Sequence, residues 1–273
     1  LSYNAHVTPY IKLKAKGGEK ITICTDDYWI GEARSFKTEY IAKEGEQEFE
    51  SLGWFNGEHI TYKIPKGVTV ISLKYRETGY DSAFCGDFKC DDEFMNSLWQ
   101  KSLRTLYVTM RDNFMDCPDR ERAQWWGDVV VLMGECFYSY STSTHALMKK
   151  AIHELVDWQR PDSTLYSPIP TGTWKNELPA QMLASISTYG FWYYYVNTGD
   201  KATIEHAYPA VKRYLGLWKL DDSGLTAYRK GGWSWGDWGT HIDIRLILAS
   251  WHYLALQSAI NMAELTGNTA DIA

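Results

Sequence analysis

Residues 113–128, near the middle of the chain, combine clustered charge with paired tryptophans. Four carboxylates, two arginines and two tryptophans lie within positions 116–128. Asp, Pro, Gly and clustered charge interrupt helical and strand patterns, so this stretch is predicted to be a loop. A solvated loop gains nothing from tryptophans, which prefer burial or a flat partner. The stretch is therefore predicted to do more than connect two elements.

Such a loop is suited to acid/base chemistry. Aromatic surface can desolvate a carboxylate and raise its pKa, whereas nearby arginines hold other carboxylates ionised. Two carboxyl groups whose pKa values are pushed apart are what hydrolysis of a glycosidic bond requires. The alternative is a structural ion-pair loop closed by a tryptophan, because ion-pair networks also perturb pKa values.

The run Asp-Cys-Pro-x-Arg-Glu-Arg-x-x-Trp-x-Gly-Asp resembles the signature loop of the α-L-rhamnosidases of glycoside hydrolase family 78. The resemblance implies that Glu121 is the general acid of an inverting hydrolysis. The side chains that it implies for sugar binding are Asp116, Arg120, Trp125 and Asp128. This chain has Gln124 where the family often has Gly, a departure that bears on the shape of the sugar pocket.

A general acid must be protonated near neutral pH, so the pKa of Glu121 must be raised. Trp125 and Trp126 are the candidates for an apolar wall beside it. We expect Arg120 and Arg122 to bind sugar hydroxyls or to pair with other carboxylates rather than with Glu121. The expected carboxylate partners are Asp116, Asp119 and Asp128.

A second candidate segment, Gly236-Asp237-Trp238, lies on a long loop that should share a face with the signature loop. Asp237 and Trp238 either line the sugar site or have a structural role, with the tryptophan packed beneath the loop and the aspartate capping a turn. Trp174 and Glu177 are weaker candidates. Glu177 is interpreted as a charge at the start of a helix that begins at Pro179.

The first part of the chain, residues 1–88, is predicted to be a β-sandwich domain. Apolar and polar residues alternate over short segments separated by glycine-containing turns, which is typical of antiparallel strands. The predicted strands are 11–15, 20–24, 48–52, 59–64 and 68–75. The domain resembles the jelly-roll that precedes the catalytic barrel in the same family, and its low strand count predicts that the sandwich begins upstream of residue 1.

The period changes to helical near residue 90, so residues 89–273 are predicted to be an α domain. The predicted helices are 91–110, 126–140, 143–159, 179–197, a segment around Pro209 to 218, and 242–265. Pro209 is expected in the first turn of its helix. Helix pairs joined by long loops predict an α/α toroid, and the family's barrel has twelve helices. We therefore expect about half of an (α/α)6 barrel, truncated and inactive alone, with the general base beyond residue 273.

The composition of the chain limits the kinds of partner and cofactor that it is predicted to bind. The net charge is −6 and no basic face is expected, so nucleic acid is an improbable partner. No apolar run reaches the length of a membrane span. The five cysteines show no C-x-x-C spacing, the seven histidines show no metal-binding spacing, and no cofactor motif is present, so neither metal nor cofactor is predicted. No targeting segment is visible, and bacterial cytoplasm and periplasm both stay open, as does the oligomeric state.

Three hypotheses follow from these patterns. The first is a bacterial glycosidase that removes terminal α-L-rhamnose from oligosaccharides or other glycosides. The second is a carbohydrate-binding relative without turnover, which a missing base residue would favour. The third is an α/α-barrel glycosidase for another sugar, which a screen of aryl glycosides would separate from the first.

Overall fold

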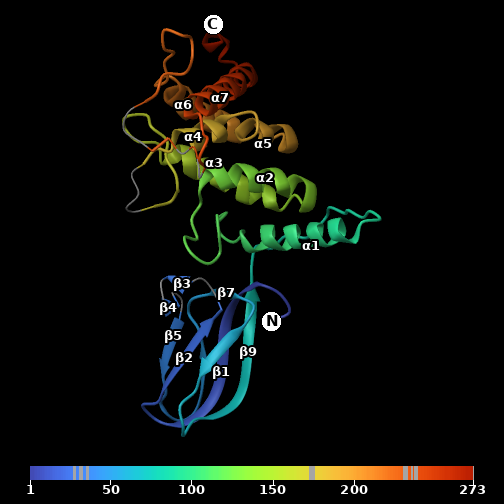
Figure 1. Ribbon diagram of the computed structural model, residues 1–273, viewed down its shortest axis with the longest axis vertical. Coiled ribbons are helices and arrows are strands. Elements are labelled where there is room, and N and C mark those ends of the chain that lie inside the picture. The colour runs from blue at the N-terminus through green and yellow to red at the C-terminus, as the bar shows by residue number, and fades with distance from the viewer. Residues whose placement is uncertain are drawn as a thin grey trace. The chain divides into compact units, whose positions relative to one another are not determined.

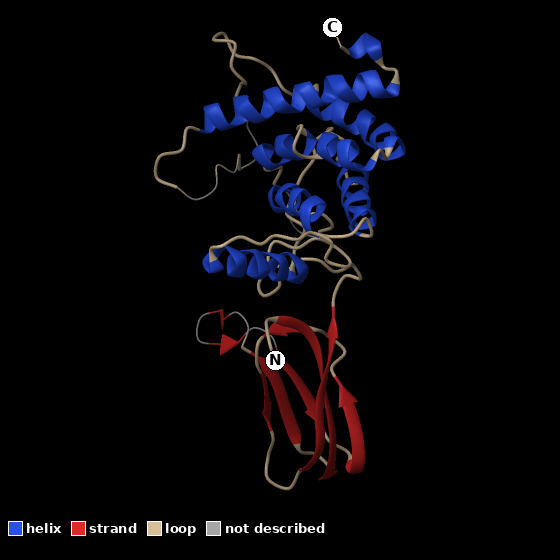
Figure 2. Cartoon of the chain, turned by 90° about the vertical axis from the view of Figure 1, so that its right-hand side faces the viewer, coloured by secondary structure: helices blue, strands red, loops and turns tan. Residues whose placement is uncertain are grey.

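A computed structural model describes residues 1–26, 29–30, 33–34, 37–171, 176–229, 233–234, 236 and 239–272. The chain divides into two compact units (Figures 1 and 2). The strand unit contains Leu1–Tyr80, Tyr107–Arg111 and Cys117–Arg122. The helical unit contains Asp81–Leu106, Asp112–Asp116 and Ala123–Ala273. The predicted change from strands to helices along the chain is confirmed.

The strand unit is built from antiparallel pairs. In the larger sheet, β1 pairs with β6, β7 and β9, and in the second sheet β2 lies between β5 and β8. A short antiparallel pair, β3 and β4, lies outside these two sheets. The strands are β1 (Ala5–Lys16), β2 (Lys20–Thr25), β3 (Trp29–Ile30), β4 (Ala33–Arg34), β5 (Lys37–Ile41), β6 (Glu44–Glu50), β7 (Phe55–Gly57), β8 (Ile60–Lys63) and β9 (Thr69–Thr78).

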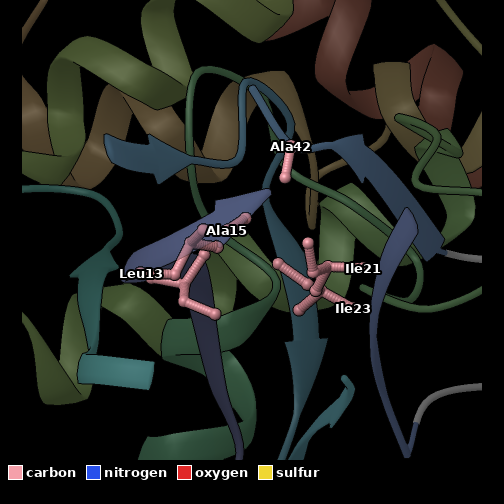
Figure 3. Packing of buried hydrophobic residues seen from close by; sticks show 6 residues of the cluster. Leu13, Ala15, Ile21, Ile23 and Ala42 are labelled. Atoms are coloured by element: carbon pink, nitrogen blue, oxygen red, sulfur yellow. The ribbon is translucent and has the colours of Figure 1, made fainter. Parts of the chain in front are cut away.

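The two larger sheets pack through the inward faces of β1 and β2. Alternate residues of β1 are buried, as the period of two requires. Leu13 and Ala15 of β1 meet Ile21 and Ile23 of β2, and Ala42 closes one end of this core (Figure 3). β1 begins at Ala5, earlier than predicted, because its first residues also pair with β7 and β9.

The helical unit consists of hairpin-connected helices. α2 packs on α4, α4 packs on α7, and α6 packs on both α3 and α7 (Figure 1). No helix among the described residues is both long and apolar enough to span a membrane. The helices are α1 (Glu93–Val108), α2 (Trp126–Ser139), α3 (Thr144–Asp157), α4 (Pro179–Ile186), α5 (Phe191–Thr198), α6 (Lys201–Leu215), α7 (Ile244–Thr266) and the 3-10 turn η1 (Thr269–Asp271).

The single helix predicted over 179–197 is wrong, because the chain breaks it into α4 and α5. Ser187 leaves the helical region with ψ 177°, and its hydroxyl donates to Ala184 O at 2.7 Å. At Gly190 the backbone passes so close to Ser185 that an added Cβ would lie 1.9 Å from the Ser185 carbonyl oxygen. Only glycine permits this approach, so the break is specified by Gly190 together with the serine.

The expectation that Pro209 lies in the first turn of its helix is also wrong, since α6 begins at Lys201. Asp200 caps this helix by accepting from the Thr203 amide at 3.1 Å and from its hydroxyl at 2.7 Å. Interior proline costs roughly 3 kcal/mol. The cap and the buried face of α6, which includes Ile204 and Val211, offset that cost.

Gly190→Ala should destabilise the helical unit by roughly 1–3 kcal/mol, because the methyl group must displace backbone rather than a flexible side chain. Gly134→Ala is the matched control. Gly134 lies inside α2 with open space around an added Cβ, so alanine there should stabilise by about 0.5–1 kcal/mol. Urea unfolding of both variants measures the difference. Equal effects of the two substitutions would show that the α4–α5 break does not depend on glycine.

Candidate active site

Backbone and side-chain hydrogen bonds close the base of the signature loop. The Asp116 amide donates to Ala123 O at 3.0 Å, and the Ala123 amide donates to Asp116 Oδ1 at 3.1 Å. The Trp125 amide also donates to Ala123 O at 3.0 Å. α2 begins directly afterwards, with the exposed Asp128 in its first turn. The predicted loop is confirmed, and Asp116 helps to define its geometry.

The tip of the loop, Cys117–Arg122, belongs to the strand unit. Asn56 Nδ2 of β7 donates to Asp119 Oδ1 at 2.6 Å. The Arg122 guanidinium stacks on Trp54 at 3.7 Å and donates through Nε to Pro118 O at 2.7 Å. Arg122 has a φ of 52°, a left-handed conformation that is uncommon for a residue with a side chain. These contacts fix the conformation of the tip.

Glu121 is exposed at this tip and forms an ion pair with its chain neighbour. Arg120 Nη2 lies 2.5 Å from Glu121 Oε1, with 53% and 35% of the two side chains exposed. This corrects the expectation that Arg120 would pair with a different carboxylate. Adjacent residues in a tight loop meet more readily than residues farther along it. A pair this exposed is worth about 0–1 kcal/mol, so other partners can displace it at little cost.

The two tryptophans have different roles in the helical unit. Trp126 is fully buried, packs edge-on against Phe191 of α5 at 5.6 Å, and donates its amide to Ser167 Oγ at 2.8 Å. Trp126 is therefore a core residue that anchors the start of α2. Trp125 is half-buried and occupies the N-cap position. Glu121 belongs to the strand unit, so the apolar wall around it stays a prediction.

Gln124, the departure from the family pattern, is a buried anchor that the sequence analysis did not identify. It is 3% exposed, and its Nε2 donates to Ile169 O at 2.9 Å and to Glu154 Oε2 at 2.8 Å. The Ile169 amide donates back to Gln124 O at 3.4 Å. Glycine could make none of the side-chain bonds. Gln124 therefore ties the end of the signature loop to the loop 158–178 that precedes α4.

Glu177 was interpreted as a helix-start charge, and the structure corrects this. Its carboxylate is buried, lies 3.0 Å from Arg229 Nη1, and accepts from the Tyr214 hydroxyl at 2.8 Å. The Arg229 guanidinium also lies 5.0 Å from the Trp218 ring. Burial raises the pKa of Glu177, and the Tyr214 hydrogen bond and the Arg229 charge offset only part of that rise. The pair joins loop 158–178 to the loop that precedes α7.

The same two segments meet again at the start of α4, where the Ala180 amide donates to Ser234 O at 3.2 Å. The loops that precede α2, α4 and α7 are thus tied to one another in succession within the helical unit. Whether the segment Gly236-Asp237-Trp238 shares a face with the signature loop stays a prediction. Asp237, Trp238 and Trp174 lie outside the described residues.

Residues 83–273 match the model of the bacterial α-L-rhamnosidase six-hairpin glycosidase domain. The chain therefore belongs to the bacterial α-L-rhamnosidases of glycoside hydrolase family 78.

Individual relatives agree with this assignment. An α-L-rhamnosidase from Formosa agariphila is 23% identical over 218 residues, which cover 73% of this chain and 22% of that protein. The family 78 rhamnosidase of Bacillus sp. GL1 superposes with a TM-score of 0.85 at 23% identity, covering 100% of this chain and 29% of that one. A rhamnosidase from Klebsiella oxytoca with rhamnose bound superposes with a TM-score of 0.79 at 15% identity, covering 99% of this chain and 57% of that one. The chain thus spans under a quarter of the length of the Formosa relative.

Glu177→Gln should destabilise the helical unit by about 3 kcal/mol, because it leaves the Arg229 charge buried without a counter-charge. The double variant Glu177→Met/Arg229→Met should recover most of that loss, since no uncompensated charge stays behind. Chemical denaturation provides the measurement.

The control is Glu205→Gln, which removes the exposed Lys201–Glu205 pair of α6. Exposed pairs at this helical spacing are worth about 0.3–0.5 kcal/mol, so this variant should stay close to wild type. If Glu177→Gln and Glu205→Gln cost the same, the Glu177–Arg229 pair does not hold the two loops together.

Proposed function

We propose that this chain carries the acid half of an α-L-rhamnosidase site, which hydrolyses terminal α-L-rhamnose from glycosides with inversion. The observation that supports the proposal most is the hydrogen-bonded signature loop, which presents Glu121 at an exposed tip and Asp128 at the start of α2. The chain belongs to a rhamnosidase family, and one structural relative carries bound rhamnose. An inverting site needs a second carboxyl group roughly 6.5–9.5 Å from the first, with a water molecule between them.

Glu121 is the proposed proton donor to the leaving oxygen. The ion pair with Arg120 favours the ionised carboxylate, which is the wrong state for an acid. Bound sugar would change both the solvation of the Glu121 carboxyl group and its ion pair with Arg120. It covers the exposed carboxyl group, and desolvation raises a carboxyl pKa. It also offers hydroxyl acceptors to Arg120, and exchange of the guanidinium costs little because the pair is exposed.

The remaining predicted site residues are proposed to hold the sugar hydroxyls and ring. Asp116 accepts from the Ala123 amide, and a carboxylate has room for several donors, so this bond is compatible with a sugar hydroxyl. Asp128 in the first turn of α2 is exposed to such a contact. Half-buried Trp125 offers a ring for stacking. Asp237 and Trp238 complete the proposed set of sugar-binding residues.

For the architecture, we propose that residues 1–88 are the C-terminal part of a jelly-roll sandwich and residues 89–273 about half of an (α/α)6 barrel. Exposed apolar side chains on one face of α1 and of α7 support the second part. Phe94 and Leu98 are 71% and 45% exposed, and Leu246 and Tyr253 are 67% and 61% exposed. Further helix hairpins that cover these faces, and that supply the general base, complete the proposed barrel.

Glu121→Gln, made in the active protein that carries this chain, should lower kcat by ~10²–10⁴ on a rhamnoside with an alkyl leaving group. Glutamine keeps the shape of the side chain but has no proton to donate. A nitrophenyl rhamnoside has a leaving group that needs little protonation, so its hydrolysis should fall far less. Steady-state kinetics on the two substrates provide the comparison.

Asp128→Asn is the matched control, because it removes one charge without touching the proton donor. Asp128→Asn should weaken the binding of both rhamnosides to the same extent. The assignment of the acid is wrong if Glu121→Gln slows the two substrates equally while Asp128→Asn shows the dependence on leaving group. Rhamnose binding without turnover in the unsubstituted protein would instead favour the carbohydrate-binding alternative.

A further inference from the structure

Three metal-ligating side chains meet on α3 and α6. His153 and Asp157 are one turn apart on α3, and His206 comes from α6, which packs on α3. His206 Nε2 lies 2.6 Å from Asp157 Oδ1, and the two imidazole rings stack with centroids 4.2 Å apart and planes at 9°. One donor atom from each residue falls within 4.8 Å of the others. None of the three residues belongs to the proposed rhamnosidase site.

The stacked imidazoles distinguish this cluster from an ordinary surface ion pair. Two imidazolium ions face to face would repel each other, so the arrangement favours at least one neutral ring. Neutral imidazole is the form that binds metal ions.

The charges around the cluster also suit a cation. Lys149 lies 3.3 Å from Asp200, so its charge is opposed locally. The charges of Asp157, Asp200 and Lys149 sum to one net negative charge beside the two imidazoles. Thr203 Oγ1 lies 3.4 Å from His153 Nε2 and donates to Asp200, which links the histidine to the capped start of α6.

We propose that His153, Asp157 and His206 form a transition-metal site that links α3 to α6. Zn²⁺ is the ion that we expect it to bind. Two imidazoles and one carboxylate form a recognised zinc donor set, and water can fill the fourth position. Mg²⁺ and Ca²⁺ prefer oxygen-only sites, so the two nitrogens select against them.

To bind one ion, the donor atoms must move closer together and the stacked rings must turn toward a common point. Tetrahedral ligands at bond lengths of roughly 2.0–2.1 Å lie about 3.3 Å apart. His206 and Asp157 are 41% and 54% exposed, so their side chains can change rotamer without disturbing the core. The bound ion replaces the Asp157–His206 hydrogen bond with ligand bonds from both helices. The expected consequence is a higher melting temperature for the helical unit.

The test is a Zn²⁺ titration of chelator-treated protein by calorimetry, with thermal melts alongside. The expected result is one Zn²⁺ per chain and a raised melting temperature, whereas Mg²⁺ changes neither. His206→Ala and Asp157→Asn each remove a ligand on an exposed side chain. Loss of a residue that only hydrogen-bonds to a metal ligand lowers metal affinity by up to ~100-fold. Loss of a ligand itself should lower the Zn²⁺ affinity by more than that in either variant.

His59→Ala is the control. His59 also pairs with an aspartate, Asp26, at 2.9 Å, and belongs to no three-residue donor group among the described residues. It should leave Zn²⁺ affinity unchanged. Co²⁺ should give the intense visible absorption of a tetrahedral ion in the wild type and in His59→Ala, and lose it in His206→Ala. Absence of Zn²⁺ binding, or equal binding by all the variants, would overturn the proposal.

Discussion

The buried amide of Gln124 is the contact on which the arrangement of the loops depends. Its side chain and backbone both bond to Ile169, and it also reaches Glu154 of α3. A buried side chain that satisfies partners on two other segments fixes their separation, because breaking either bond leaves a polar group unsatisfied. Within the helical unit, the end of the signature loop is therefore held by Gln124 as well as by the bonds between Asp116 and Ala123.

The buried Glu177–Arg229 pair likewise joins two loops, the one that precedes α4 and the one that precedes α7. The raised pKa of Glu177 shows that burial outweighs the favourable contacts of its ionised form. Such a pair is a poor source of net stability, yet removal of one partner is costly. Its place between two long loops suits a role in holding them in one arrangement, which a site assembled from several loops requires.

Local patterns in the sequence predicted much of this structure. Strand alternation predicted β2 and β9, and the spacing of apolar residues predicted α2, α3 and α7, because each pattern depends only on near neighbours. The break at Gly190 was missed because a close backbone approach leaves no periodic signal. α6 begins earlier than predicted, because the Asp200 cap and the buried face of the helix offset the cost of an interior proline.

Residues of the candidate site could be predicted where a local motif contains them. Contacts between residues far apart in the sequence could not be predicted. The signature loop was recognised from its residues, but the Arg120–Glu121 pair was not, since exposed neighbours choose partners by local loop geometry. Glu177 and Arg229 are separated by 52 positions, and His153 and His206 by 53, so no spacing rule joins them. Only the fold brings each pair together.

The proposed function requires single-step hydrolysis of an α-L-rhamnoside at the signature loop. Proton NMR of the first sugar released by the active protein that carries this chain is its most direct test. Inversion at the anomeric carbon predicts that β-L-rhamnose appears first and then mutarotates. Initial release of α-L-rhamnose would contradict the account, because it requires a nucleophile in place of a base that activates water.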